Sequence, residues 1–141
     1  MIKKIVVKDG ITYWITADGS AEYQKADGKA KGSVVIPNTV KLQGKKYKVT
    51  SIAAKAFYNN KKIKKIVIGK NVIKIGKKAF YGCSKLQKIL IRSEKLSAGK
   101  VGKKAFYKIY KKAVVKVPSK CKKQYVVWLK KTGITGGRKI H

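Results

Sequence analysis

Residues 63–91 read IKKIVIGKNVIKIGKKAFYGCSKLQKILI, and two landmarks within this stretch recur along the chain at matching intervals. The alanine-phenylalanine pair at 79–80 returns at 56–57 and 105–106, so the pairs are separated by 23 and 26 residues. Short runs rich in β-branched residues are separated by 32, 23 and 26 residues, and they lie at 34–36, 66–68, 89–91 and 115–117. Two independent landmarks with shared spacings indicate a structural repeat.

The pattern inside each unit favours a leucine-rich repeat solenoid, for which a period of about 20–29 residues is typical. Residues 63–71 satisfy L-x-x-L-x-L-x-x-N with isoleucine in place of leucine, and residues 86–91 repeat its first six positions. We therefore predict a strand-rich α/β solenoid with a short parallel β-sheet and a convex side of turns or short helices. Two insertions, a hairpin over 40–49 and a segment around 93–99, are expected to project as loops.

These units resemble the BspA-type leucine-rich repeats of bacterial surface proteins. The resemblance covers about residues 33–118 and rests on Ala-Phe-x-x-Cys-x-x-Leu, which stands nearly whole at 79–86. The other copies depart from this motif, because Asn60 and Ile109 stand where Cys83 does. The resemblance implies an extracellular or cell-surface bacterial protein that serves adhesion or protein binding, without catalysis and without a cofactor.

Both ends carry patterns that a solenoid needs to cover its terminal repeats. Residues 4–33 read as a β-meander with turns at Asp-Gly pairs, and residues 1–33 are predicted to form an N-terminal β cap. The repeats are assigned to 34–118, as about three to four coils with a period of ~23 residues. A capping helix is predicted over 119–133, with Ser119 as its N-cap, followed by a frayed tail at 134–141. All parts are expected to form one folding domain.

The sequence KKAFY, which stands at 77–81 and again at 103–107, has two interpretations. Cations beside aromatic rings are typical of a surface that grips nucleic acid. Alternatively, a ring at the same phase of every coil fills a core, because equivalent residues of a solenoid stack about 5 Å apart. We favour the second interpretation, in which Phe57, Phe80 and Phe106 form one buried column. The tyrosine after each phenylalanine is expected to be half-exposed, so that it could contact a ligand.

Positive charge is the outlier of the composition, since 37 basic residues against five acidic ones give a net charge of +32. Residues 34–141 hold 31 of the basic residues and only one acid, Glu94. Such a field attracts any polyanion. The coil register predicts two lysine ladders, which comprise Lys55, Lys78 and Lys104, and Lys62, Lys85 and Lys111. Unit charges ~5 Å apart repel by about 0.8 kcal/mol in water. The ladders therefore cost little and reflect either solubility or contact with an anionic surface.

The concave sheet should expose the strand residues that alternate with the buried ones. The candidate binding surface consists of Val35, Val67, Leu90 and Lys116 with their flanking cations Lys65, Lys88 and Arg92. An apolar stripe edged with cations is suited to dock a protein. The alternative is that these residues reflect only the β-propensity of a short strand.

Catalytic and metal sites are not indicated by the sequence. The only histidine is His141, and four of the five acids lie in the first 33 residues, so general acid–base groups are missing from the repeats. Residues 99–104 have too few glycines for a phosphate loop. Cys83 and Cys121 lie 38 residues apart without a CxxC motif, so no zinc site is indicated. We favour buried free thiols, and the alternative is a disulfide between the two cysteines.

The absence of a run of about 18 apolar residues excludes membrane insertion. The start, MIKKIVVKDG, lacks the apolar stretch of a signal peptide, which leaves a cytosolic protein or a mature piece. Taken together, the sequence predicts a monomeric, non-enzymatic surface module that binds a host or cell-surface protein through a cationic solenoid. The alternative is a module that binds a polyanion: nucleic acid, glycosaminoglycan or anionic cell-wall polymer.

Overall fold

The computed structural model describes residues 2–26, 30–135 and 139–141, which form two β-sheets and one C-terminal helix. The strands are β1 (Ile2–Lys8), β2 (Ile11–Thr16), β3 (Ser20–Ala26), β4 (Gly32–Ile36), β5 (Thr39–Leu42), β6 (Lys45–Ile52), β7 (Ile63–Ile68), β8 (Lys74–Ile75), β9 (Lys88–Ile91), β10 (Val114–Lys116) and β11 (Lys139–Ile140). The helical elements are the 3-10 turns η1 (Ala98–Lys100) and η2 (Ser119–Cys121) and the helix α1 (Lys122–Thr132).

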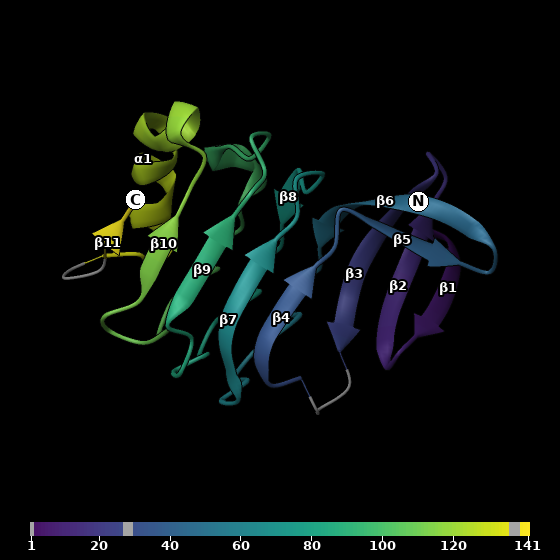
Figure 1. The fold of residues 1–141 in the computed structure, drawn as a ribbon, viewed down its shortest axis with the longest axis horizontal. Coiled ribbons are helices and arrows are strands. Elements are labelled where there is room, and N and C mark those ends of the chain that lie inside the picture. The colour runs from purple at the N-terminus through teal and green to yellow at the C-terminus, as the bar shows by residue number, and fades with distance from the viewer. Residues whose placement is uncertain (1, 27–29, 136–138) are drawn as a thin grey trace.

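The chain winds into a strand-rich solenoid of about three turns. One sheet has the order β11-β10-β9-β7-β4, and the other has the order β1-β2-β3-β6-β5, with β8 paired to β6. Figure 1 shows β4, β7, β9 and β10 side by side, with the β1–β3 meander at one end of the molecule and α1 at the other. The prediction of a parallel-sheet solenoid is confirmed in this coarse form.

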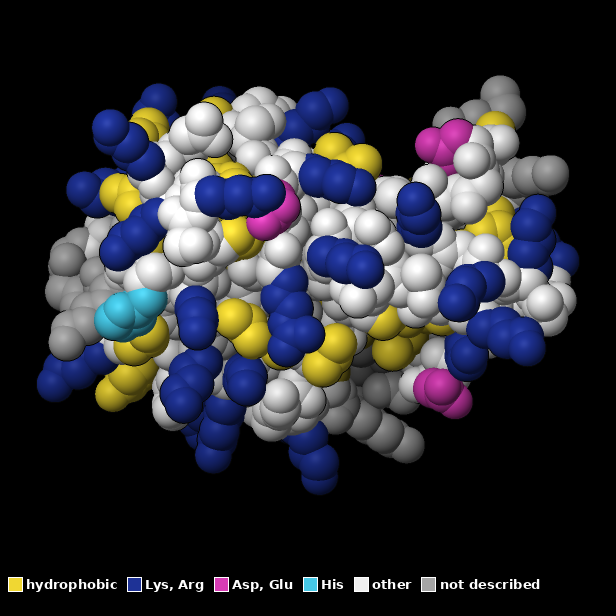
Figure 2. All heavy atoms as spheres, turned by 45° about the horizontal axis from the view of Figure 1, so that its top comes forward, with side chains coloured by type: hydrophobic (Ala, Val, Ile, Leu, Met, Phe, Trp, Pro, Cys, Tyr) yellow, Lys and Arg dark blue, Asp and Glu magenta, His cyan; other side chains and the backbone are white. Residues whose placement is uncertain are grey.

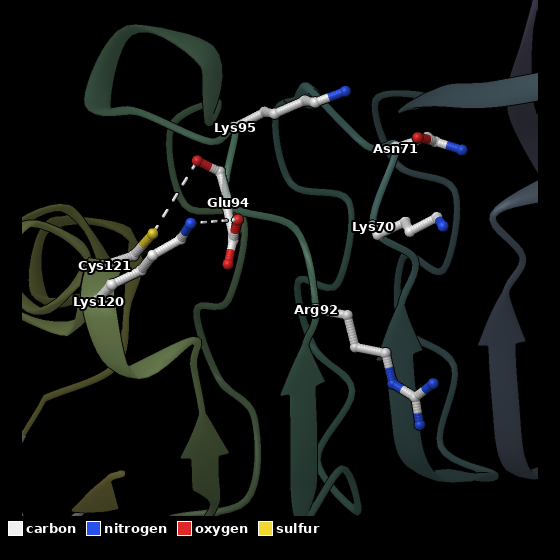
Figure 3. A pocket seen from close by; sticks show the side chains of 7 residues that line it. All are labelled: Lys70, Asn71, Arg92, Glu94, Lys95, Lys120 and Cys121. Atoms are coloured by element: carbon white, nitrogen blue, oxygen red, sulfur yellow. Dashed lines mark hydrogen bonds and ion pairs between the residues drawn. The ribbon is translucent and has the colours of Figure 1, made fainter.

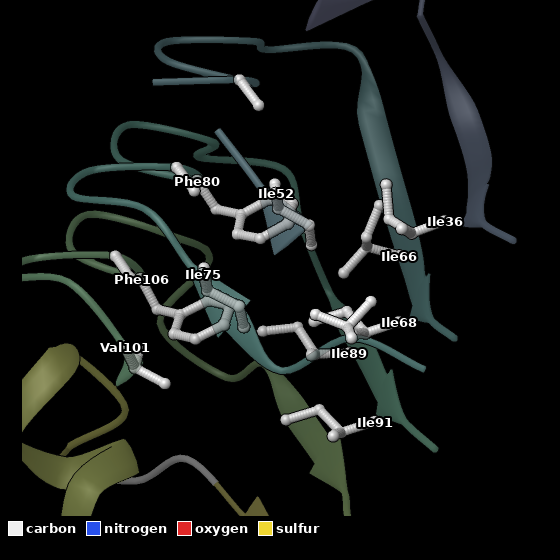
Figure 4. Close-up of a cluster of buried hydrophobic side chains, with 14 of the residues drawn as sticks. Ile36, Ile52, Ile66, Ile68, Ile75, Phe80, Ile89, Ile91, Val101 and Phe106 are labelled. Carbon is white, nitrogen blue, oxygen red and sulfur yellow. The ribbon is translucent and has the colours of Figure 1, made fainter. Parts of the chain in front are cut away.

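The core lies between the two sheets and consists of residues that repeat at the same phase of each coil. Parallel pairing aligns Ile36 with Ile68 and Ile68 with Ile91, so that one branched side chain stacks on the next. A second column, Ile52, Ile75 and Val101, runs along the other sheet and its continuing bridge. Figure 4 shows these side chains converging on the interior. Such stacking explains why β-branched residues recur at these positions.

The phenylalanines form a stacked column inside the turns that follow the second sheet. Phe57, Phe80 and Phe106 are 3%, 0% and 0% exposed. Their ring centroids lie 5.2 Å and 5.3 Å apart, with nearly parallel planes. Tyr23 of the meander continues the column at 5.5 Å from Phe57, and Tyr13 meets Tyr23 edge-on at 5.6 Å. These rings fill the core, so they are not available to stack on nucleic-acid bases.

Backbone hydrogen bonds tie the phenylalanine turns of adjacent coils together. The amide of Phe57 donates to the carbonyl of Ala79 at 2.7 Å, and the amide of Phe80 donates to Ala105 at 2.8 Å. At the last coil, the amide of Phe106 donates to Thr132 at 2.8 Å, at the end of α1. The turns therefore form a second coil-to-coil ladder opposite the parallel sheet.

The C-terminal segment differs from its prediction at both ends. Ser119 does not cap α1, because η2 precedes the helix and Cys121 occupies the N-cap position without a side-chain hydrogen bond. After the helix, β11 pairs in parallel with β10, and His141 exchanges backbone hydrogen bonds with Val115 and Val117. The open edge of β10 provides the donors and acceptors for this strand. Residues 139–141 are therefore not a frayed tail.

Neither insertion is a free loop. The hairpin forms around Gln43 and Gly44, whose positive φ angles of 50° and 82° suit a two-residue turn, but β6 then pairs with β3. In the second insertion, the backbone amide of Leu96 donates to the Tyr125 hydroxyl at 3.1 Å. This hydroxyl in turn donates to the carbonyl of Ser93 at 2.7 Å. The second insertion, predicted to project as a loop, instead packs against α1 through these hydrogen bonds.

Cys83 tests the packing of the coils. Both cysteines are free and buried, and the Cys83 thiol donates to the carbonyl of Phe57 at 3.0 Å. Burial raises the pKa of this thiol from 9.0 to about 12. Only the thiolate is nucleophilic, and each pH unit below the pKa lowers the thiolate population about tenfold. At pH 8, we expect iodoacetamide to alkylate Cys83 about 1000-fold more slowly in the native protein than in the unfolded chain.

The alkylation rate can be followed by mass spectrometry of the Cys83 peptide in buffer and in concentrated urea. The unfolded chain is the matched control, since it has the same sequence and the same reagent access to both cysteines. Equal rates in the two conditions would show that the thiol is open to solvent and that the coils are not packed as described.

Candidate functional site

The outer face of the parallel sheet brings the predicted surface residues into one row. Pairing aligns Val35 with Val67, Val67 with Leu90, and Leu90 with Lys116 across β4, β7, β9 and β10. Because strand side chains alternate between faces, this row points away from the buried isoleucines. Figure 2 shows hydrophobic side chains crossing this face with Lys and Arg side chains on both sides.

Exposure along the row is uneven, which corrects one expectation. Val35 is 55% exposed and Leu90 is half-buried, but Val67 is only 8% exposed. Val67 lies between Val35 and Leu90 in the row. The prediction that Val67 faces solvent is therefore wrong, although the residue does belong to this face.

A hollow of about 420 Å³, here called the concave hollow, lies over β9 and β10. Its lining residues are Lys65, Lys88, Ile89, Leu90, Val114, Lys116 and His141. It thus unites four of the seven residues of the predicted binding surface, which are Lys65, Lys88, Leu90 and Lys116. Val35, Val67 and Arg92 are not among the lining residues. Val35 lies on β4, Val67 is buried, and Arg92 follows the end of β9. Val114 and His141 were not predicted from the sequence. Val114 pairs with Lys88 across β10 and β9, and the pairing of β11 with β10 brings His141 to this face.

The rim of the concave hollow is cationic and its floor is apolar. Lys88 and Lys116 are exposed and Lys65 is half-buried, while Leu90 and Val114 contribute hydrocarbon surface. No acidic side chain lines the hollow among the described residues. Ammonium groups around an apolar floor can accept a segment that carries both carboxylates and an apolar side chain.

One lysine ladder is fixed by aromatic rings on the convex side. The ammonium groups of Lys55, Lys78 and Lys104 lie 5.3, 5.4 and 5.7 Å from the ring centroids of the tyrosines three residues later in the chain. These lysines have positive φ angles of 58°, 56° and 58°, which places each side chain over its ring. Tyr58 and Tyr107 are 41% and 37% exposed, in agreement with half-exposed tyrosines. The sequence contains this signal as Lys-x-x-Tyr, which was not recognised as a cation–π pair.

The other ladder divides between two places. Lys62 and Lys85 line a hollow of about 520 Å³, here called the lysine hollow, whose other lining residues are Lys31, Gly32, Lys61 and Lys64. Lys111 is exposed and does not line this hollow. The described residues contain no group of three or more His, Cys, Asp or Glu side chains that could hold a metal ion. Within the same part of the chain, no helix has the length and apolar character needed to cross a membrane.

Comparisons with known proteins place this fold among bacterial repeat proteins. The family model described as BspA type Leucine rich repeat region matches residues 34–134 in six copies. A leucine-rich repeat protein from Bacteroides capillosus is 28% identical with a TM-score of 0.65, and the match covers 83% of this chain and 84% of that one. A leucine rich repeat protein from T. pallidum is 26% identical with a TM-score of 0.61, over 79% of this chain and 53% of that one.

A leucine rich cell surface protein from Faecalibacterium prausnitzii has the same fold, with 24% identity and a TM-score of 0.65. The match covers 81% of this chain and 33% of that protein, so this chain spans about a third of its length. No protein of curated function matches the chain.

Proposed function

Because the chain belongs to the BspA-type leucine-rich repeat family, we propose that it is a bacterial surface or secreted module that binds a protein partner through the concave hollow. The observation that carries this proposal is the apolar floor of Leu90 and Val114 inside a rim of three lysines. The similar protein from Faecalibacterium prausnitzii, described as a cell surface protein, supports the location. The module acts without catalysis, by presenting a shape and a charge.

Binding through this face requires little ordering of the protein. The row of strand residues belongs to a sheet whose backbone is paired on both sides at β7 and β9. A preformed surface of this kind loses little conformational entropy on association. The net charge of +32 steers an acidic partner toward the module, and the lysine rim fixes its orientation.

The two ends of the chain serve this function by protecting the stack. The β1–β3 meander covers the first coil, where Tyr23 extends the phenylalanine column. Residues 119–133 cover the last coil, where Gly133 would bring a Cβ within 2.6 Å of the Phe106 backbone and therefore packs directly on it. With both ends covered, the repeats at 34–118 remain soluble as a monomer.

A photo-crosslinking amino acid at Leu90 tests the proposed face. We expect it to capture a partner from a mixture of bacterial-surface and host extracellular proteins. The capture should be saturable, and the same protein without the crosslinker should compete with it. Lys88→Glu, which reverses a rim charge, is expected to weaken the binding of that partner by about tenfold or more. The matched control is the same crosslinker at Val127, an exposed apolar residue on α1 that is 57% exposed. Equal capture at the two positions would contradict the proposal.

Polyanion binding is the alternative function, and the exposed lysine–tyrosine ladder favours it. Binding to heparin, DNA and RNA across a salt series separates the two functions. If the affinities for all three polymers fall with salt concentration along parallel slopes, binding reflects generic counterion release caused by the net positive charge. An affinity that survives physiological salt for one polymer favours the alternative, as does retention on purified cell wall that is lost when its phosphate polymers are removed.

A further inference from the structure

A third hollow, here called the Arg92 hollow, lies where β7 and β9 end and the η2–α1 segment begins. It has a volume of about 660 Å³ and is lined by Lys70, Asn71, Arg92, Glu94, Lys95, Lys120 and Cys121. It shares no lining residue with the concave hollow. Figure 3 shows Glu94 and Lys120 on one side of it, Lys70 and Asn71 on the opposite side, and Arg92 and Lys95 between them.

The residue types of this hollow do not follow from the composition of the chain. Lysine supplies 35 of the 37 basic residues, and the two arginines are Arg92 and Arg138. Arg138 lies outside the described residues, so Arg92 is the one arginine that the structure places. Glu94 is the only acid after residue 33. A lysine-rich surface alone explains the lysine hollow, but it does not explain why these two exceptions line the same hollow.

The charges of the Arg92 hollow are arranged to leave a positive centre. The carboxylate of Glu94 lies 3.0 Å from the ammonium of Lys120 and keeps this side chain at one edge. This pair leaves Lys70, Arg92 and Lys95 without an acidic partner among the lining residues. The first turn of α1 adds to this potential, since it contains no acidic residue and has no side-chain cap.

The backbone that carries these cations is held firmly. The Ser93 hydroxyl, fully buried, donates to the carbonyl of Val72 and accepts from the Lys95 amide at 3.1 Å. The Asn71 side chain, 8% exposed, donates to the carbonyl of Asn38 at 2.9 Å. The strand ends therefore present their cations from fixed points, as a binding site requires.

We propose that the Arg92 hollow binds a phosphoryl group, with Arg92 as its bidentate ligand and Lys70 and Lys95 as further donors. Arginine presents a planar fork of donors that matches two phosphate oxygens, which an ammonium does not. A carboxylate has only two oxygens in one plane, so it satisfies Arg92 and leaves the lysines on the other sides unused. Lys120, positioned by Glu94, closes one edge of the site.

The hollow of about 660 Å³ has room for a phosphoryl group that is part of a larger molecule. A soluble phosphomonoester and a phospholipid headgroup present the same chemistry. This inference goes beyond the binding of a protein partner, and it uses different residues.

The test follows the Arg92 guanidinium by NMR during titration at a constant ionic strength of about 0.15 M. The probes are inorganic phosphate, glycerol 3-phosphate, phosphatidylcholine vesicles with and without phosphatidic acid, and acetate. We expect saturable shifts with both soluble phosphates and binding of acetate at least about tenfold weaker. Tighter binding to glycerol 3-phosphate than to vesicles with phosphatidic acid identifies a soluble ligand, and tighter binding to those vesicles than to glycerol 3-phosphate identifies a lipid headgroup.

Variants separate a built site from the general field. Arg92→Lys keeps the charge and removes the fork, and we expect about tenfold weaker phosphate binding. Because the Arg92 variants lack the guanidinium group, their binding is followed by the backbone amide signal of Lys95. Arg92→Gln is compared with Lys64→Gln, which removes one positive charge from the lysine hollow instead. We expect Arg92→Gln to weaken phosphate binding about tenfold or more, and Lys64→Gln to weaken it less than twofold. Both side chains are exposed, so unchanged circular dichroism serves as the folding control. Equal losses in these two variants, equal affinity for acetate, or no saturation would overturn the proposal.

Discussion

Phe80→Ala is expected to lower the free energy of unfolding by about 3–5 kcal/mol. The ring is 0% exposed and lies between Phe57 and Phe106, at centroid distances of 5.2 Å and 5.3 Å. Removing it takes away the contacts of both neighbours at once, and the coils on either side are tied by backbone hydrogen bonds that resist collapse into the space. The cost should therefore include the full cavity contribution.

Urea denaturation followed by far-UV circular dichroism measures this loss. Tyr107→Ala is the matched control, since it truncates a ring that is 37% exposed in the adjacent coil. We expect this control to cost about 1 kcal/mol, mainly from the contact with Lys104. A loss below about 1 kcal/mol for Phe80→Ala would contradict burial of the column.

Gly76→Ala has the second-largest expected effect, about 3 kcal/mol of destabilisation. A Cβ at this position would lie 2.2 Å from the amide nitrogen of Ala54 and 2.6 Å from the carbonyl carbon of Ala53. The obstacle is the backbone of the preceding coil, which cannot rotate away as a side chain does. A Cβ at Gly102 would meet the backbone of Lys77 at 2.3 Å in the same manner, so the backbones of adjacent coils are in close contact at both glycines.

Gly99→Ala provides the control for this effect, because no atom lies within 4 Å of a Cβ at that position. We expect its unfolding free energy to stay within about 0.5 kcal/mol of the unchanged protein. Thermal and urea unfolding of both variants measure the difference. If the two substitutions cost the same, close approach of the coils at Gly76 is wrong.

The solenoid could be predicted from the sequence because its core repeats at a fixed phase. Each coil places Phe80 or its equivalent, and Ile66 or its equivalent, on the same residue types of the next coil. Because equivalent residues stack from coil to coil, the same residue types recur in the sequence with the period of one coil. The same register predicts the row on the outer face of the sheet, and with it most of the concave hollow.

The parts that could not be predicted depend on contacts without a local pattern. The pairing of β11 uses backbone groups at the edge of β10, so nothing in the residues 139–141 marks it. The packing of the second insertion depends on the hydroxyl of Tyr125, which lies 29 residues away from Leu96. The alternation of side chains along a strand predicts that Arg92 lies on the same outer face of the sheet as Leu90. Its position beyond the last residue of β9 instead places it in a separate hollow.

The hydrogen bond from the Phe106 amide to the Thr132 carbonyl, 2.8 Å long, has a consequence for how the molecule comes apart. Every earlier turn of this ladder is anchored by the coil after it, but the last turn is anchored by helix α1. Detachment of the helix would deprive the Phe106 turn of its acceptor and open the ring column to water at that point. Each coil that unfolds would in turn remove the hydrogen-bond acceptor of the preceding coil. Unfolding should therefore proceed coil by coil from the C-terminal end.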